Sequence, residues 1–126
     1  MKKEDLRIVV LDNALELGNK VNKNLNDIRN NDNNYIIPFT NSRFSNGEGK
    51  VRLESSVRDK DLYIISDVGN YGLTYKMHGV DHIISPDEHF QDIKRVISAT
   101  SGHAARITVV MPLLYQARQH KRKGRE

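Results

Sequence analysis

Leu6-Arg7-Ile8-Val9-Val10-Leu11 decides the fold class, because a short apolar run rich in β-branched side chains is typical of a buried strand. Asp61-Leu62-Tyr63-Ile64-Ile65-Ser66 has the same character, and a longer apolar run extends from Ala105 to Leu114. Strands buried on both faces belong to parallel sheets that helices cover. The three runs therefore predict the core strands of an α/β domain.

A first helix is predicted soon after Leu11. Asn13 matches an N-cap residue, and Glu16, three residues later, matches its capping-box partner. Apolar side chains then recur at spacings of four, four and three, which places them on one face of a helix that ends at about Arg29. These side chains are Leu17, Val21, Leu25 and Ile28.

A second helix is predicted to begin after Ser85, because Ser85, Pro86 and Glu88 match an N-cap, a first-turn proline and a capping-box glutamate. The face predicted to pack inward comprises His89, Phe90, Ile93, Val96, Ile97 and Thr100. Gly102 suits the cap that ends this helix. We expect His103 to lie in the loop that follows.

The segment between the helices contains a predicted hairpin. Residues 35–39 are predicted to form a short strand, with Pro38 favouring a sheet edge. Residues 50–54 alternate polar and apolar side chains, the pattern of a half-exposed strand, and turn-forming residues 45–49 precede them. We expect a hairpin that stands away from the main sheet. Residues 69–84 contain three glycines and no clear period, which predicts a loop.

The order of these elements predicts one α/β domain over residues 1–126, a parallel sheet flanked by helices with a protruding β-hairpin. In such folds, ligands bind at the carboxyl ends of the strands. A basic run begins just beyond the last predicted strand. We therefore expect a site for an anion at that end of the sheet.

Composition excludes several classes of protein. A chain of 126 residues without Cys suits one domain with no disulfide, thiolate nucleophile or Cys-ligated metal. No apolar run approaches the length of a membrane span, about 18 residues, and the N-terminus lacks the pattern of a signal peptide. We expect a soluble, cytoplasmic protein that binds no membrane.

The excess of positive charge lies at the C-terminus. Residues 118–126 hold five basic residues and one acid, whereas the preceding 117 residues hold 15 of each. A local cluster favours an anion site or a polyanion-binding tail over a generally basic surface. A solvated chain end without a ligand explains the run equally well, and both interpretations stay open on composition alone.

The sequence contains no recognisable catalytic motif. His78 and His82 lie four residues apart, but no third ligand is suitably spaced, so no metal site is predicted. A phosphate-binding glycine motif and a nucleophile elbow are both absent. Phe44 lies beside Asn46 and Glu48 in the predicted turn. Such a group can stack on a purine and bond its edge, or Phe44 can be an inward-facing turn residue.

Two separated motifs resemble one family. The stretch RFSNGEGKVRLESSVRDKDLYII, residues 43–65, is similar in order and spacing to the hairpin region of ribose-phosphate pyrophosphokinases. Tyr115-Gln116-Ala117-Arg118-Gln119 resembles the family's Tyr-Ala-Arg-Gln-Asp, which also follows an apolar strand, and Arg125-Glu126 resembles its Arg-Glu-Pro. The resemblance covers nearly the whole chain but only the N-terminal half of such an enzyme.

The resemblance implies a phosphoribosyltransferase-like fold and transfer of diphosphate from Mg-ATP to ribose 5-phosphate, a step of nucleotide biosynthesis. In the family, ATP lies between two subunits. The matching ATP-binding residues are Phe44, Asn46 and Glu48 around adenine, with Arg118 and Gln119 from the other subunit. The resemblance thus implies Mg²⁺ as the cofactor and a dimer-based oligomer, which is a hexamer in the family.

Other positions are more distant matches. Ser56 and Arg58 match a regulatory phosphate site of the family. His120 stands where the family has Asp, and residues 11–14 replace the family's Gly-Asn/Ser signature after the first strand, which indicates a divergent member. Further candidates for binding phosphate are Lys121, Arg122, Lys123 and Arg125.

The family's ribose 5-phosphate loop, metal-binding His and catalytic loop have no counterpart in these residues, so we expect the isolated chain to be catalytically inactive. We also expect the domain to be incomplete at the C-terminus, without a final helix and strand, so that an apolar sheet face or edge is uncovered and the chain either self-associates or is poorly stable. Two alternatives stay open: a non-catalytic homologue that acts in oligomerisation or regulation, and a binder of polyanions or nucleic acid. The neutral body and few aromatic residues argue against a dedicated nucleic-acid module.

Overall fold

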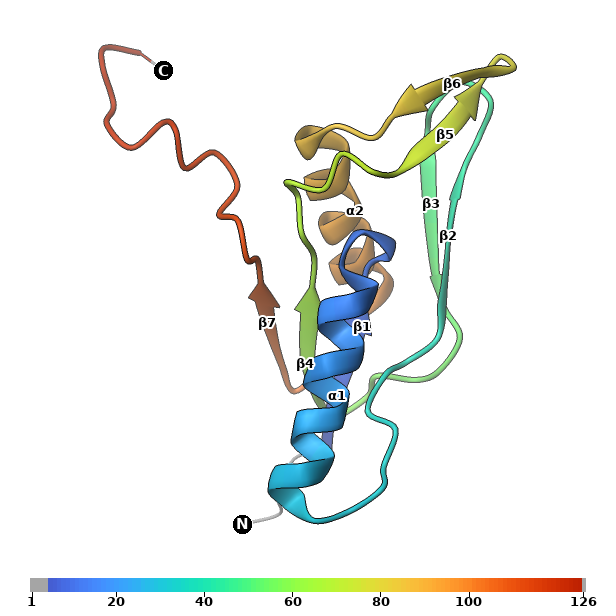
Figure 1. Ribbon diagram of the computed structural model, residues 1–126, viewed down its shortest axis with the longest axis vertical. Coiled ribbons are helices and arrows are strands. Elements are labelled where there is room, and N and C mark those ends of the chain that lie inside the picture. The colour runs from blue at the N-terminus through green and yellow to red at the C-terminus, as the bar shows by residue number, and fades with distance from the viewer. Residues whose placement is uncertain (1–4, 126) are drawn as a thin grey trace.

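A three-stranded parallel sheet forms the centre of the structure, a computed structural model that describes residues 5–125 (Figure 1). Its strands are β1 (Asp5–Val10), β4 (Lys60–Ile65) and β7 (Arg106–Val110), in the order β1-β4-β7. β4 pairs in parallel with both neighbours. The predicted α/β architecture with a parallel sheet is therefore confirmed.

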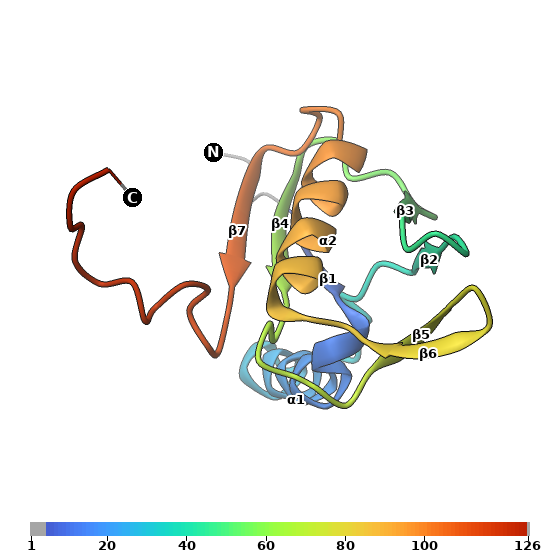
Figure 2. The same ribbon diagram turned by 90° about the horizontal axis from the view of Figure 1, so that it is seen from above.

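Two helices cover opposite faces of this sheet (Figures 1 and 2). α1 (Leu15–Arg29) and α2 (Pro86–Ala99) match the predicted helices, and the capping box of α2 forms as expected between Ser85 and Glu88. Alternate residues of β1 point to the two faces: Ile8 packs in a cluster with side chains of α1, and Val9 packs in a second cluster with Val96 of α2. This explains why the strand is continuously apolar from Ile8 to Val10.

The predicted cap of α1 is wrong. Asn13 lies in a short 3-10 turn (Asp12–Ala14), and Ala14 occupies the N-cap position without a side-chain hydrogen bond. The buried Asn13 side chain instead donates to Ser66 Oγ (3.0 Å) and accepts from the Asp67 N–H (2.9 Å). Asn13 therefore joins the carboxyl ends of β1 and β4, and its amide is not available to cap the helix.

The predicted protruding hairpin is present, but its first strand lies later in the sequence. β2 (Phe39–Arg43) pairs antiparallel with β3 (Gly49–Leu53) as a separate two-stranded sheet. Residues 35–39 do not form the expected strand: only Ile36 makes an isolated bridge, to Ile8 of β1. Pro38 has no N–H to donate to a neighbouring strand, so the segment leaves the sheet there.

The loop predicted over residues 69–84 is also wrong, because it contains a second hairpin. β5 (Thr74–Met77) pairs antiparallel with β6 (Val80–Ile83). Its two-residue turn, His78-Gly79, has positive φ at both positions (51° and 79°), as hairpin turns of this length require. The turn escaped prediction because His-Gly is not one of the residue pairs typical of a two-residue hairpin turn, such as Asn-Gly or Asp-Gly.

Two predicted boundaries near the C-terminal end need correction. β7 stops at Val110, short of the expected Leu114, because Pro112 cannot continue the ladder of hydrogen bonds. α2 ends at Ala99 with Thr100 as its C-cap, so Gly102, at φ +73°, lies two residues beyond the cap. Neither helix among residues 5–125 is long and apolar enough to cross a membrane.

An apolar strip remains uncovered beside α1, as the sequence led us to expect. Leu6, Tyr63 and Val110 line a hollow of about 270 Å³ whose walls are almost wholly apolar, together with Val21 and Leu25 of α1. β7 is the outermost strand in the order β1-β4-β7, so its outer edge has no partner strand among residues 5–125. An exposed strand edge beside an apolar surface favours association with another polypeptide segment.

Candidate functional site

The tip of the β2–β3 hairpin presents the residues that the sequence singled out. The Phe44 N–H donates to the Glu48 carbonyl (2.8 Å), and Ser45, Asn46 and Gly47 form the three-residue loop between them. Gly47 has φ +92°, the left-handed conformation that ends such a loop. The Asn46 side chain accepts from the Glu48 N–H (3.1 Å) and so stiffens the turn.

Phe44 is exposed to 53% at this tip, so it does not pack inward. An exposed aromatic ring supplies an apolar stacking face, while the neighbouring Asn46 amide and Glu48 carboxylate supply hydrogen-bonding groups. This arrangement is able to stack on a planar heterocycle and bond its edge. The exposure of Phe44 excludes the inward-facing interpretation of the turn, and a binding role for it stays a prediction.

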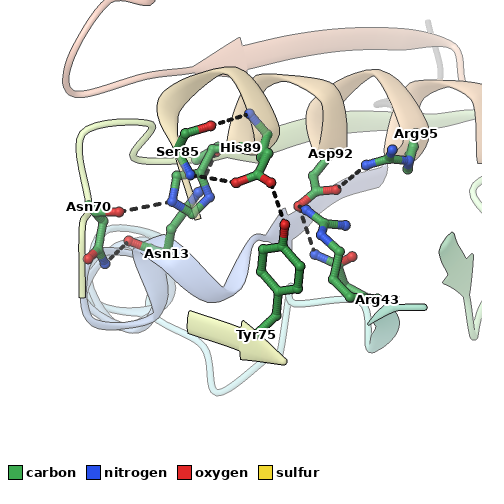
Figure 3. A network of polar contacts seen from close by, with 11 residues as sticks. Asn13, Arg43, Asn70, Tyr75, Ser85, His89, Asp92 and Arg95 are labelled. Atoms are coloured by element: carbon green, nitrogen blue, oxygen red, sulfur yellow. Dashed lines mark hydrogen bonds and ion pairs between the residues drawn. The ribbon is translucent and has the colours of Figure 1, made fainter. Parts of the chain in front are cut away.

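A buried ionic cluster at the base of the tip was not predicted from the sequence (Figure 3). Arg43, the residue before Phe44, is bonded to Asp92 of α2 (2.6 Å), and Arg95 bonds the other oxygen of the same carboxylate (2.6 Å). Asn41 donates to Asp92 as well (3.2 Å). The side chains of Arg43 and Asp92 are only 9% and 4% exposed.

The sequence does contain a signal for this cluster. Asp92 lies in the middle of the predicted apolar face of α2, between His89 and Val96, where a carboxylate requires a buried partner. In β2, Asn41 and Arg43 alternate with exposed residues and therefore share one face. The sequence pattern does not show that the hairpin packs on α2. Without that contact, Asp92 cannot be paired with Asn41 and Arg43.

The second hairpin supports the same region. Tyr75 of β5 donates to Glu88 of α2 (2.8 Å), and the His78 N–H donates to the Ser45 carbonyl in the first hairpin (3.0 Å). Burial favours a higher pKa for Glu88, but hydrogen bonds from the Ser85 N–H and from Tyr75 outweigh it and hold that pKa below its ordinary value. The hydrogen bond to Glu88 and then burial raise the pKa of Tyr75.

A polar hollow of about 360 Å³ lies between the two hairpins and the end of β1. Its lining includes Asp12, Asn41, Arg43 and Lys76. Burial, followed by the charge of Asp92, raises the pKa of Asp12. The hollow brings cationic and anionic groups together, so it has no strong preference for an anion.

The C-terminal basic segment lies on the other side of the molecule. Residues 118–125 are exposed, and Figures 1 and 2 both place this segment far from the β2–β3 hairpin. One residue holds its beginning: Tyr115 stacks on Phe90 of α2 (ring centroids 4.0 Å apart, planes 10° apart) and donates to Asp87 (2.5 Å). Within one copy, Arg118 and Gln119 are therefore not brought to Phe44.

Ser56 and Arg58 lie close together in the loop before β4. The Arg58 N–H donates to the Ser56 hydroxyl (3.2 Å), and both residues line a hollow of about 510 Å³ with Arg7 and Lys60. Arg7 and Lys60 are each paired with Asp5. The loop thus gathers positive charge at the amino ends of the strands, away from the two hairpin tips.

The histidine residues discussed in the sequence analysis do not form a metal site in the described part of the chain. His78 lies in the turn of the second hairpin, and His82 packs against the Tyr75 ring (5.9 Å between centroids). His89 is buried, and its Nε2 lies 2.9 Å from the Asn70 carbonyl. No group of three His, Asp or Glu side chains among residues 5–125 is arranged to hold an ion. Glu126 lies outside the described residues.

Comparison with known proteins assigns the chain to a family. Residues 6–126 match the model for the N-terminal domain of ribose phosphate pyrophosphokinase. In Schizosaccharomyces pombe, ribose-phosphate pyrophosphokinase 5 is 31% identical over 83 residues and ribose-phosphate pyrophosphokinase 1 is 34% identical over 86 residues. These matches cover 65% and 67% of this chain but only 20% and 18% of the relatives. The chain belongs to the family defined by the N-terminal domain of ribose phosphate pyrophosphokinase.

Proposed function

We propose that the β2–β3 hairpin binds the adenine ring of Mg-ATP, as part of a ribose-phosphate pyrophosphokinase with a phosphoribosyltransferase-like fold. The observation that carries the proposal is the half-exposed Phe44 ring at the tip of an ordered turn, beside Asn46 and Glu48. The Asn46 carbonyl oxygen is bonded to the turn, which leaves its NH₂ group as a donor for the base edge. The choice of adenine as the base follows from the resemblance of residues 43–65 to the hairpin region of the family.

The phosphates of the same ATP would be bound by a second copy of the chain. Arg118 and Gln119 are exposed and lie too far from Phe44 to complete a site within one copy. Arginine binds phosphate in bidentate fashion, and lysine adds point charge. The basic run that follows would extend this contact through Lys121, Arg122, Lys123 and Arg125.

Magnesium would enter this site with the nucleotide. No three-ligand group among residues 5–125 could hold the ion on its own. Mg²⁺ commonly keeps several waters and binds substrate phosphates in place of an all-protein cage. The residues present therefore fit a Mg-ATP complex whose metal is coordinated mainly by phosphate, and the chain supplies base and phosphate contacts around it.

The reaction itself belongs to the whole protein. The chain spans about a fifth of the length of the curated relatives that it matches. We propose that the full protein transfers diphosphate from Mg-ATP to ribose 5-phosphate in nucleotide biosynthesis, in the cytoplasm, and that the loop of Ser56 and Arg58 binds a regulatory phosphate. A non-catalytic member would keep the same fold and assembly without turnover.

Calorimetry with Mg-ATP tests the base site. Phe44→Ala should weaken binding by about 5-fold or more, since a base–aromatic stack contributes about 1–3 kcal/mol. Tyr71→Ala is the matched control, because Tyr71 is also an exposed aromatic residue but lies outside the hairpin tip. Unchanged affinity in Phe44→Ala would overturn the proposal. Binding of ATP and of a DNA oligonucleotide with equal, steeply salt-dependent affinity would favour the polyanion alternative.

A further inference from the structure

The Asp92 carboxylate is the polar contact that joins the β2–β3 hairpin to α2, beside the apolar packing of Phe39, Val51 and Leu53 on the core. It accepts hydrogen bonds from two β2 side chains, Arg43 at 2.6 Å and Asn41 at 3.2 Å. Arg95, one turn along α2, holds the other carboxylate oxygen at 2.6 Å. The carboxylate is thus held from both sides, and its position fixes that of Arg43.

The hairpin is shaped to allow this contact. Gly49 lies directly opposite Arg43 in the β2–β3 register. A Cβ atom added at Gly49 would overlap Arg43 Nη1 and would lie 2.6 Å from Arg95 Nη1, so any larger residue would displace a guanidinium group. The glycine therefore leaves the space in which two arginine side chains converge on Asp92.

Stability alone does not account for an ionic cluster at this place. Removing two charges from water is costly, and well-packed apolar residues often replace a buried ion pair without loss of stability. An ion pair adds direction, because hydrogen-bond geometry fixes the angle at which two elements meet. Arg43 directly precedes Phe44, so the direction set at Asp92 is passed to the ring at the tip.

We propose that Asp92 is a positioning residue of the adenine site. It holds Arg43 and Asn41 so that Phe44, Asn46 and Glu48 face the nucleotide in one orientation. The role of Asp92 in binding rests on the proposed function of the hairpin. Its role in ordering the hairpin stands on the contacts of Arg43, Asn41 and Arg95 with the carboxylate.

The test removes the buried Arg43–Asp92 pair together, because Asp92→Asn alone leaves Arg43 buried beside a neutral group and endangers folding. Arg95 remains, but its side chain is already 26% exposed and can turn to solvent. In the double variant Arg43→Met/Asp92→Leu, we expect a melting curve close to that of the wild type. We expect the Phe44 and Gly47 amides, which close the turn, to exchange with solvent at least several-fold faster, while core amides of β4 are unchanged. Mg-ATP affinity should fall about 10-fold.

Asp61→Asn is the matched control, since Asp61 is also a buried carboxylate bonded to an arginine, Arg106, but lies outside the hairpin. It should leave hairpin exchange and nucleotide affinity unchanged. Wild-type hairpin exchange in the folded double variant would overturn the inference. If hairpin amide exchange rises in the Arg43→Met/Asp92→Leu variant but ATP affinity is unchanged both there and in Phe44→Ala, the proposed function fails. If only Phe44→Ala loses affinity, the binding role of Asp92 fails alone.

Discussion

The β2–β3 hairpin and the C-terminal segment, residues 111–125, both extend from the body of the domain, and both contact α2, but they are held very differently. The hairpin is held by the buried Asp92 carboxylate, by a hydrogen bond from the second hairpin, and by apolar packing of Phe39, Val51 and Leu53 on the core. The C-terminal segment makes its α2 contact through Tyr115, at Phe90 and Asp87. Its residues beyond Tyr115 are exposed.

This difference matches the two tasks that we assign. A planar base needs a stacking surface of fixed orientation, which a buried cluster provides. Phosphate groups are held by charge, and long arginine and lysine side chains adapt to them. In the proposed site, a rigid base platform on one copy meets an adaptable phosphate-binding segment of another.

The largest effect should come from breaking the buried cluster on one side. Asp92→Leu leaves Arg43 and Arg95 without their shared partner, so the free energy of unfolding should fall by about 3–5 kcal/mol. Urea denaturation measures it. Asp87→Leu, on the exposed first turn of the same helix, should cost less than about 1 kcal/mol. Equal losses in the two variants would contradict the contrast between a buried and a surface anchor.

A smaller effect should follow from releasing the C-terminal segment. Tyr115→Ala removes the stack on Phe90, and such aromatic pairs contribute about 0.5–1.5 kcal/mol beyond their buried area. The melting temperature should therefore change little, whereas trypsin should cleave the basic run clearly faster. Tyr115→Phe keeps the stack and loses only the hydrogen bond to Asp87. Its rate of trypsin cleavage should therefore lie between those of the wild type and Tyr115→Ala. Wild-type cleavage rates in Tyr115→Ala would show that other contacts hold the segment.

The smallest effect concerns the second support of the hairpin, through Glu88. Because the folded state holds the pKa of Glu88 below its ordinary value of 4.5, its stabilising contribution is present above that pH and is lost as pH falls through the folded pKa. Glu88→Gln should lower the melting temperature slightly at neutral pH, and the difference from wild type should close on acidification. A constant difference at all pH values would exclude a contribution from the Glu88 charge.

Local signals explain what the sequence predicted correctly. The capping box at Ser85 and Glu88 spans four residues, and the alternation around residues 50–54 is visible within one strand. Asn13 misled the prediction because its partners, Ser66 and Asp67, lie more than fifty residues away. The second hairpin was missed because its strands have four residues each and His78-Gly79 is not a common turn pair.

The candidate site divides in the same way. The exposed tip with Phe44, Asn46 and Glu48 was found from a contiguous motif, whereas its support was missed because Arg43 and Asp92 are 49 residues apart. Arg118 was found from local charge, but the sequence could not show where it lies relative to the hairpin. Contacts between distant elements decide both, and a single sequence does not encode them in any local pattern.

The most direct measurement is Mg-ATP binding by an equimolar mixture of Phe44→Ala and Arg118→Ala chains. Each variant alone should bind weakly, because every shared site loses one essential side chain. In a randomly mixed two-fold dimer, one site of each heterodimer carries both native side chains, so about a quarter of all sites should regain wild-type affinity. A mixture that binds no better than either variant would contradict a nucleotide site shared between the hairpin of one copy and the basic segment of another.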